Sequence, residues 1–190
     1  MSTVPDIEIV QQVLKGNMQA YSVLVSRYQD YAFTLALRIV GSREDAEEVA
    51  QDSFIKAYRA LADFRSESKF STWLYTIVNR TSLSFLRKKK ADIQSLDNEK
   101  IFNTVNSEAS PLPVNSMEQK SKAATINAAI ERLRADDAEV ITLFYLNEQS
   151  LEEIAIILGI ETNAAKVRLH RARQRLKEVM EKYYVAELRS

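Results

Sequence analysis

The sequence has no cysteine and only one histidine, His170. Without thiols, disulfide frameworks, thiolate zinc sites and cysteine nucleophiles are excluded, and neither a metal nor a cofactor is expected. This composition suits a reducing compartment, so we expect a cytoplasmic protein. No stretch approaches the roughly 18 apolar residues of a membrane helix, and the opening "MSTVPDIEIVQQ" lacks the basic and apolar regions of a signal peptide. Membrane insertion is therefore not expected.

Glycine and proline are also scarce, with 3 of each among 190 residues. This scarcity disfavours the turn-rich sequences of β-sandwiches and barrels. The chain is rich instead in alanine, leucine, glutamate, arginine and lysine, which favour helices, and its 46% of hydrophobic residues are enough to build a core. We predict an all-α protein of two small helical domains joined by a flexible linker.

The first domain, residues 1–90, is predicted to contain four helices. An apolar stripe from Tyr21 to Ile39, with spacings of three and four residues, is the clearest helical pattern of the chain. After it, Ser42 and Asp45 resemble a capping box that opens the third helix. The fourth helix is predicted to end in the basic run "RKKK".

Residues 91–118 lose this periodicity and contain two of the three prolines, so we predict a flexible linker there. Periodicity returns over residues 119–190, which are predicted to form four more helices. Ser150 and Glu153 give a capping-box pattern at the start of the third, and Gly159 ends that helix after two turns.

The last predicted helix has the pattern of a DNA-recognition helix. Two helices joined by a short glycine-containing turn, the second one basic, are the sequence form of a helix-turn-helix. Residues 162–177 contain no acid, whereas an ordinary solvated helix, the competing interpretation, mixes charges of both signs. An apolar stripe must face the domain, and it comprises Ala165, Leu169, Ala172, Leu176 and Val179.

The other side chains of this helix are predicted to contact DNA. The opposite face is expected to enter a groove and read bases, through Lys166, Val167, His170 and Arg171, with Asn163 and Gln174 beside them. Cations on the flanks are expected to reach phosphates, and these are Arg168, Arg173, Arg175 and Lys177.

On these motifs the chain resembles the extracytoplasmic-function (group 4) sigma factors. "GIETNAAKVRLHRARQRL" is similar to the pattern that ends the family's C-terminal domain, and "REDAEEVAQDSFIKAYRALADFRSESKFSTWLYTIVNR" is similar to its second conserved region. The resemblance spans both domains, in the family's order. One departure is at Ala164 and Ala165, where the family has Thr and Val, so a hydroxyl that can contact phosphate or cap the helix is absent.

The resemblance implies a subunit that binds core RNA polymerase, through the β′ clamp and the β flap, and reads promoter DNA. The C-terminal domain would read the minus-35 element, because the four groove-facing residues stand at the family's recognition positions. An anti-sigma factor is implied as a further partner, while no small-molecule substrate is. In the family, one helix of the first domain docks on the β′ clamp. The resemblance implies the same role for the matching positions of this chain, which are Asp45, Glu48, Val49, Gln51, Asp52 and Phe54.

The segment "FRSESKF" and the following "STWLYTIVNR" interleave aromatic and basic residues, as do surfaces that hold unpaired bases. The family resemblance places the minus-10 pocket here, at Phe64, Arg65, Lys69, Phe70, Trp73, Tyr75, Asn79 and Arg80, with residues 87–90 for the duplex upstream. The competing interpretation buries the rings in a core, and it is favoured for Trp73. The acids of the third helix also have two interpretations. They can bind polymerase, or they can simply stabilise the N-terminus of their own helix.

Two other classes of function are weighed against a sigma factor. A stand-alone helix-turn-helix regulator would bind duplex DNA without polymerase, but the N-terminal half lacks the alternating strands and helices of a receiver or ligand-binding domain. A hydrolase using acids such as Asp45 and Glu48 would rest on paired carboxylates that any acidic helix offers, and no glycine-rich phosphate cradle is present. We expect no enzyme.

Overall fold

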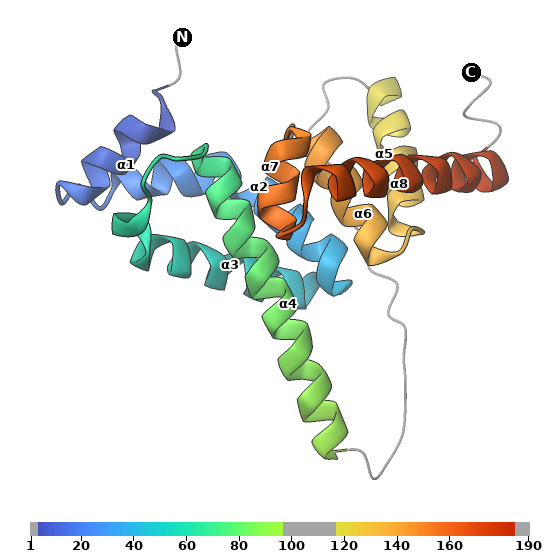
Figure 1. The fold of residues 1–190 in the computed structure, drawn as a ribbon, viewed down its shortest axis with the longest axis horizontal. Helices are drawn as coiled ribbons and strands as arrows, with labels where there is room; N and C mark the ends of the chain where they lie inside the picture. Colours follow the sequence, from blue (N-terminus) through green and yellow to red (C-terminus); the bar gives the residue numbers. More distant parts are fainter. Residues whose placement is uncertain (1–3, 97–116, 185–190) are drawn as a thin grey trace.

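The computed structural model describes residues 4–96 and 117–184 (Figure 1). Within these two ranges the chain forms helices and turns and no strand, which confirms the all-α prediction. Most of the predicted linker, residues 97–116, lies outside the described residues. None of the described helices is both long and apolar enough to cross a membrane.

The first domain has four α-helices and one short 3-10 turn. They are α1 (Asp6–Leu14), α2 (Ala20–Val40), α3 (Arg43–Arg59), the turn Leu61–Asp63, and α4 (Phe70–Leu96). Helix α4 therefore runs six residues past the end predicted for the domain, into the segment predicted as linker.

The junction between α2 and α3 follows from two adjacent residues. Gly41 ends α2 in the left-handed conformation, with φ of 76°. The Ser42 hydroxyl then caps α3 by accepting the Asp45 N–H at 3.4 Å. The predicted capping box is only half formed, because the Asp45 carboxylate binds the Lys89 ammonium at 2.5 Å instead.

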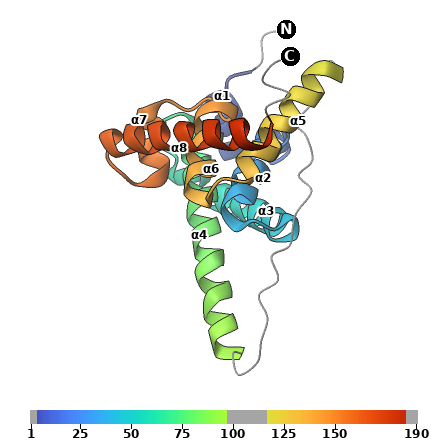
Figure 2. The same ribbon diagram turned by 90° about the vertical axis from the view of Figure 1, so that its right-hand side faces the viewer.

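The core of the first domain lies where α2, α3 and α4 pack together. The stripe predicted on α2 is buried at Leu24, Ala32 and Leu35, while Leu74 and Val78 of α4 meet it without exposed surface. Each buried leucine contributes about 1.5 to 3 kcal/mol relative to an exposed one. This core fixes the direction of α4, whose far end projects from the body of the molecule (Figure 2).

The second domain also has four α-helices, with a π-helical turn after the second. They are α5 (Met117–Glu131), α6 (Ala135–Ile141), the turn Thr142–Leu146, α7 (Leu151–Leu158) and α8 (Thr162–Tyr183). The capping box predicted at Ser150 and Glu153 is confirmed, since each side chain accepts the other residue's backbone N–H.

The two domains pack directly on each other. Helix α7 lies along α4, and α6 with its π-helical turn lies against α2 (Figure 1). The sequence predicted a flexible linker between the domains and left their relative orientation open. In the structure, the helix-turn-helix rests on the helix that carries the predicted minus-10 residues.

Candidate nucleic-acid interface

Helix α8 has one buried and one exposed face. Ala165, Leu169 and Ala172 are buried against the rest of the second domain, and Leu176 and Val179 are half-buried, so the predicted stripe is confirmed. Because the stripe fixes the rotation of the helix, the side chains on the other face point to solvent. All of those predicted to enter the groove, and the two predicted to lie beside them, are exposed: Lys166, Val167, His170 and Arg171, with Asn163 and Gln174.

Helices α7 and α8 are joined by a tight turn at Gly159. Its φ of 65° is left-handed, a conformation that glycine adopts at little cost. The N–H groups of Gly159 and Ile160 bond to the carbonyls of Ile156 at 3.3 Å and Ala155 at 3.0 Å, which satisfies acceptors at the end of α7. Thr162 then begins α8. The predicted helix-turn-helix geometry is therefore present.

Two of the flanking arginines are oriented by contacts within the domain. Arg175 pairs with the buried carboxylate of Asp137 at 2.5 Å. The Arg173 guanidinium lies over the rings of Phe144 and Tyr145, at 4.9 and 5.3 Å from their centroids. Both arginine side chains remain exposed, so these contacts hold the cations at the surface beside the groove-facing residues.

A buried carboxylate lies beneath the basic helix. Glu139 of α6 is 7% exposed, and its Oε1 has no hydrogen-bond partner among the described residues. Burial raises the pKa of Glu139 to about 7, against the opposing charge of Arg168 and with a smaller contribution from Asp136. The carboxyl group is therefore partly protonated at neutral pH.

Replacing this carboxylate should make the second domain more stable in neutral and basic solution. Since the pKa of Glu139 is higher in the folded chain than the ordinary 4.5, its ionisation removes stability as the pH rises from about 4.5 to about 7. We expect Glu139→Gln to gain roughly 1 to 3 kcal/mol above that window relative to its effect below it. Urea unfolding across the window measures this, with the exposed Glu178→Gln as control, and a pH-independent difference would contradict it.

The aromatic residues predicted for the minus-10 pocket lie around the start of α4. Phe64, Phe70 and Trp73 form a cluster with ring centroids 5.2 to 5.7 Å apart. Phe70 is 3% exposed and Tyr75 2%, and both pack against Tyr28 of α2. This corrects the prediction for these two rings, because faces used in the core are closed to a base. Phe64 and Trp73 are half-buried, so for Trp73 the core interpretation holds in part.

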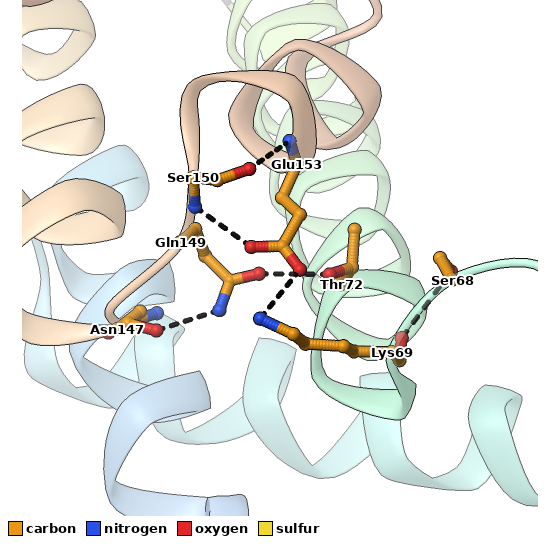
Figure 3. A network of polar contacts seen from close by, with 7 residues as sticks. All are labelled: Ser68, Lys69, Thr72, Asn147, Gln149, Ser150 and Glu153. Atoms are coloured by element: carbon orange, nitrogen blue, oxygen red, sulfur yellow. Dashed lines mark hydrogen bonds and ion pairs between the residues drawn. The ribbon is translucent and has the colours of Figure 1, made fainter.

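The polar residues predicted for the same pocket fall into two groups. Arg65 and Arg80 are exposed. Lys69 forms an ion pair with Glu153 of α7 at 3.0 Å (Figure 3). Asn79 is buried beneath the same helix. The second domain thus covers part of the surface predicted to receive unpaired bases.

Helix α3 carries the charges predicted to bind polymerase. The Asp45 carboxylate, 18% exposed, is held by Lys89, and the Asp52 carboxylate, 48% exposed, is held by Lys56 at 2.6 Å. Both ion pairs leave the carboxylates near the surface. Exposed pairs of this kind contribute little to stability, so partners can exchange at small cost.

The apolar residues predicted on the same surface face the other way. Val49 and Phe54 are 1% and 8% exposed and belong to the core, which corrects the prediction that they anchor a partner. Glu48 and Gln51 are exposed, as is Ile55, at 50%. Ile55 is therefore the large apolar side chain that this part of α3 offers to a partner.

The comparisons with known proteins cover both domains. The Sigma-70 region 2 family matches residues 24–91, and the Sigma-70 region 4 family matches residues 124–176. The ECF RNA polymerase sigma factor SigW of Bacillus subtilis is 33% identical over 175 residues, which are 89% of this chain and 93% of SigW. The chain belongs to the extracytoplasmic-function sigma factors. The ECF RNA polymerase sigma-E factor of Salmonella typhimurium is 36% identical over 174 residues, 89% of this sigma factor and 91% of the relative.

A solved structure has the same fold as this sigma factor. The co-crystal structure of the sigma factor RpoE in complex with the anti-sigma factor NepR, from Bartonella quintana, gives a TM-score of 0.69 at 25% identity and covers 85% of this chain and 96% of that one. The resemblance drawn from the motifs is confirmed. This sigma factor binds core RNA polymerase and directs promoter recognition, melting and initiation; the stand-alone regulator gains no support.

Sequence reasoning missed the residues that join the two domains of this sigma factor. Thr72 donates a hydrogen bond at 3.0 Å to Gln149, and both are buried. One signal was available, because Thr72 and Asn79 lie seven positions apart and therefore on one face of α4. Polar residues on a face next to the apolar stripe indicate a second contact surface, although they do not identify what covers it.

Proposed function

We propose that α8 reads the minus-35 element with Lys166, Val167, His170 and Arg171. The single observation that supports this most strongly is the exposure of these side chains on an acid-free face opposite the buried stripe. Arginine and lysine favour guanine in the major groove, whereas Val167 can contact only methyl or sugar groups. Arg168, Arg173 and Arg175 bind phosphates on either side of the groove.

The minus-10 element is bound by those predicted pocket residues around the start of α4 that are not buried in the core of the first domain. Arg65, Lys69 and Arg80 follow the phosphates, Asn79 offers amide hydrogen bonds once uncovered, and the edges of Phe64 and Trp73 contact bases. A base leaving the stack costs a few kcal/mol, and a stacking contact returns about 1 to 3 kcal/mol. One or two such contacts therefore favour opening of a weakly paired element. The exposed residues 87–90 hold the duplex upstream.

Core polymerase is bound by the acidic side of α3 through its β′ clamp, with Asp45, Glu48, Gln51 and Asp52 supplying polar contacts and Ile55 an apolar one. The second domain contacts the β flap of the polymerase. The sigma factor works in the cytoplasm. It selects promoters for the polymerase and performs no catalysis itself. An anti-sigma factor restrains it, as NepR binds its relative RpoE.

Run-off transcription from a genomic promoter library tests the proposal. Core polymerase alone should give little promoter-specific transcript, whereas addition of the chain should give transcripts whose start sites share two sequence elements at a fixed separation. Those elements also yield the sequence that α8 and α4 recognise. Unchanged transcript ends on addition of the chain would refute the proposal.

A further inference from the structure

A cavity of about 530 Å³ lies on one flank of α8, where α6 packs against it (Figure 1). One wall belongs to the turn between α5 and α6 and to the start of α6, and it includes Arg134 and Asp136. The other wall belongs to α8 and includes Val167 and Arg171, which were assigned above to the groove-facing side. The cavity therefore borders the surface that is proposed to enter DNA.

The lining of this cavity is more basic than acidic. Its charged residues are four arginines and two aspartates, namely Arg134, Arg168, Arg171, Arg175, Asp136 and Asp137. The charge of Asp137 is already matched, because its buried carboxylate pairs with Arg175 at 2.5 Å. Arg168 is offset in part by the buried Glu139 beneath it. The excess of positive charge that remains attracts an anion.

Arg134 has a fixed backbone and a side chain that is available to a partner. Its carbonyl accepts the N–H groups of Asp137 and Ala138, both at 2.9 Å, and so begins α6. Its guanidinium is exposed and forms no hydrogen bond or ion pair within the described part of the chain. A guanidinium presents its five N–H donors in a planar fork, which fits the oxygens of a phosphate.

The dimensions of DNA bring a backbone to this cavity when α8 occupies the major groove. The groove is about 12 Å wide, and a helix with its side chains is about 10 to 12 Å across. The phosphates that border the groove therefore pass close to both flanks of an inserted helix. Because Val167 and Arg171 belong both to the cavity and to the groove-facing side, one of the two backbones passes over the cavity.

We propose that this cavity is a phosphate site and that Arg134 binds the DNA backbone beside the minus-35 element. Arg168 supplies positive charge from the opposite wall, so the phosphate lies between α8 and the turn before α6. The DNA contact then extends beyond the helix-turn-helix to a residue that sequence reasoning did not assign. This inference rests on the proposed function, since it is the insertion of α8 into the minus-35 element that brings a backbone to the cavity.

Removal of single phosphate charges from the DNA tests the inference. A promoter fragment from the transcription experiment carries one neutral methylphosphonate linkage at a time around the minus-35 element. Its affinity for the chain with core polymerase is measured at a temperature too low for strand opening. Arg134→Gln should bind the unmodified fragment roughly three- to tenfold more weakly than the native chain. At one position, or at two adjacent ones, the neutral linkage should weaken the native chain but not Arg134→Gln, because the contact is already lost.

The salt dependence of binding gives a second measurement of the same contact. Each neutralised phosphate contributes about 0.9 to the slope of the logarithm of the affinity against the logarithm of the salt concentration, so Arg134→Gln should lower this slope by about one. Arg132→Gln is the matched control, since Arg132 is an exposed cation of the same turn whose guanidinium lies over the Tyr183 ring, 4.4 Å from its centroid. It should change neither the slope nor the phosphate profile.

The exposed acid of the same cavity provides the opposite substitution. Asp136 lies in the lining, and its negative charge opposes a bound phosphate. Asp136→Asn should therefore bind the unmodified promoter fragment roughly two- to threefold more tightly than the native chain, and this gain should disappear when the phosphate assigned to Arg134 is neutral. Unchanged or weaker binding by Asp136→Asn would show that no phosphate lies in the cavity.

The outcomes separate this inference from the proposed function. Identical phosphate profiles for the native chain and Arg134→Gln, or equal losses from Arg132→Gln, would overturn the phosphate site while leaving the minus-35 role of α8 intact. Inorganic pyrophosphate distinguishes DNA from a free anion. If calorimetry shows micromolar binding to the chain alone that Arg134→Gln abolishes, while the phosphate profile is unchanged, the cavity serves a free anion and the backbone contact is wrong. A native chain that forms no promoter-specific complex with core polymerase would overturn the proposed function itself.

Discussion

The double substitution Lys166→Ala and Arg171→Ala is expected to lower transcription from a promoter with an intact minus-35 element by roughly 10- to 100-fold. Both side chains are exposed on the face of α8 opposite the buried Leu169 stripe, so neither contributes to the core. A good contact of such a side chain with a base is worth about 1 to 3 kcal/mol, and two contacts at the lower end of that scale, about 2 kcal/mol together, correspond to a loss of roughly 30-fold, within the expected range. Run-off transcription at saturating core polymerase measures the effect.

A matched control comes from the same helix. Lys177→Ala with Lys182→Ala also removes two exposed positive charges, but from the half of α8 that lies beyond the groove-facing residues. We expect no more than about a threefold change, because neither side chain faces the groove and Lys177 is predicted to contact a phosphate only. Equal losses in the two double variants would show that the charge of α8, and not its recognition face, drives promoter binding.

Leu74→Ala is expected to destabilise the first domain by about 2 to 5 kcal/mol. Leu74 has no exposed surface, and it lies where α4 packs on α2, so its removal leaves a cavity in the core. Promoter opening should fail with it, because the core sets the direction of α4. Chemical denaturation followed by the helical circular dichroism signal measures the loss.

Leu83→Ala provides the comparison on the same helix. Leu83 is 46% exposed, so its truncation should change the free energy of unfolding by less than about 0.5 kcal/mol. A loss from Leu74→Ala no larger than that of Leu83→Ala would mean that the packing of α4 on α2 is not the main support of the domain.

The features that could be predicted from the sequence depend on neighbours in the chain. The buried stripe of α8 follows from the spacing of Ala165, Leu169 and Ala172, and the cap of α7 follows from Ser150 and Glu153, three residues apart. Such patterns involve residues within one or two turns of each other. The number and order of the helices were therefore accessible before the structure.

The corrections concern residues whose surroundings are set by distant parts of the chain. Phe54 lies on the inward side of α3, and Phe70 and Tyr75 pack on Tyr28, which family motifs alone do not reveal. A motif records which residues occur together, but it does not say whether a ring serves the core or a ligand.

The contact between the domains was beyond sequence reasoning for a related reason. Thr72 and Gln149 are separated by 77 positions, and Asn79 and Ile157 by 78. Polar side chains such as these are equally suited to solvent, to DNA and to a helix end, so the pattern leaves their partner open. Only the packing of α7 on α4 identifies it.

The net charge of the chain is zero, but its acidic and basic residues are concentrated on different helices. Acids are concentrated at the start of α3, including Glu44 and Glu48, whereas residues 162–177 of α8 carry cations alone. Opposite ends of the chain therefore suit opposite partners: the acidic side of α3 suits a basic protein surface, and α8 suits nucleic acid.

The central claim is that this chain reads promoters as part of the polymerase and not alone. Its most direct test is the binding of a labelled promoter fragment by the purified chain, with and without core RNA polymerase, in the same salt. We predict a stable, sequence-specific complex only when core polymerase is present. Tight, sequence-specific binding of the same fragment by the isolated chain would contradict the account.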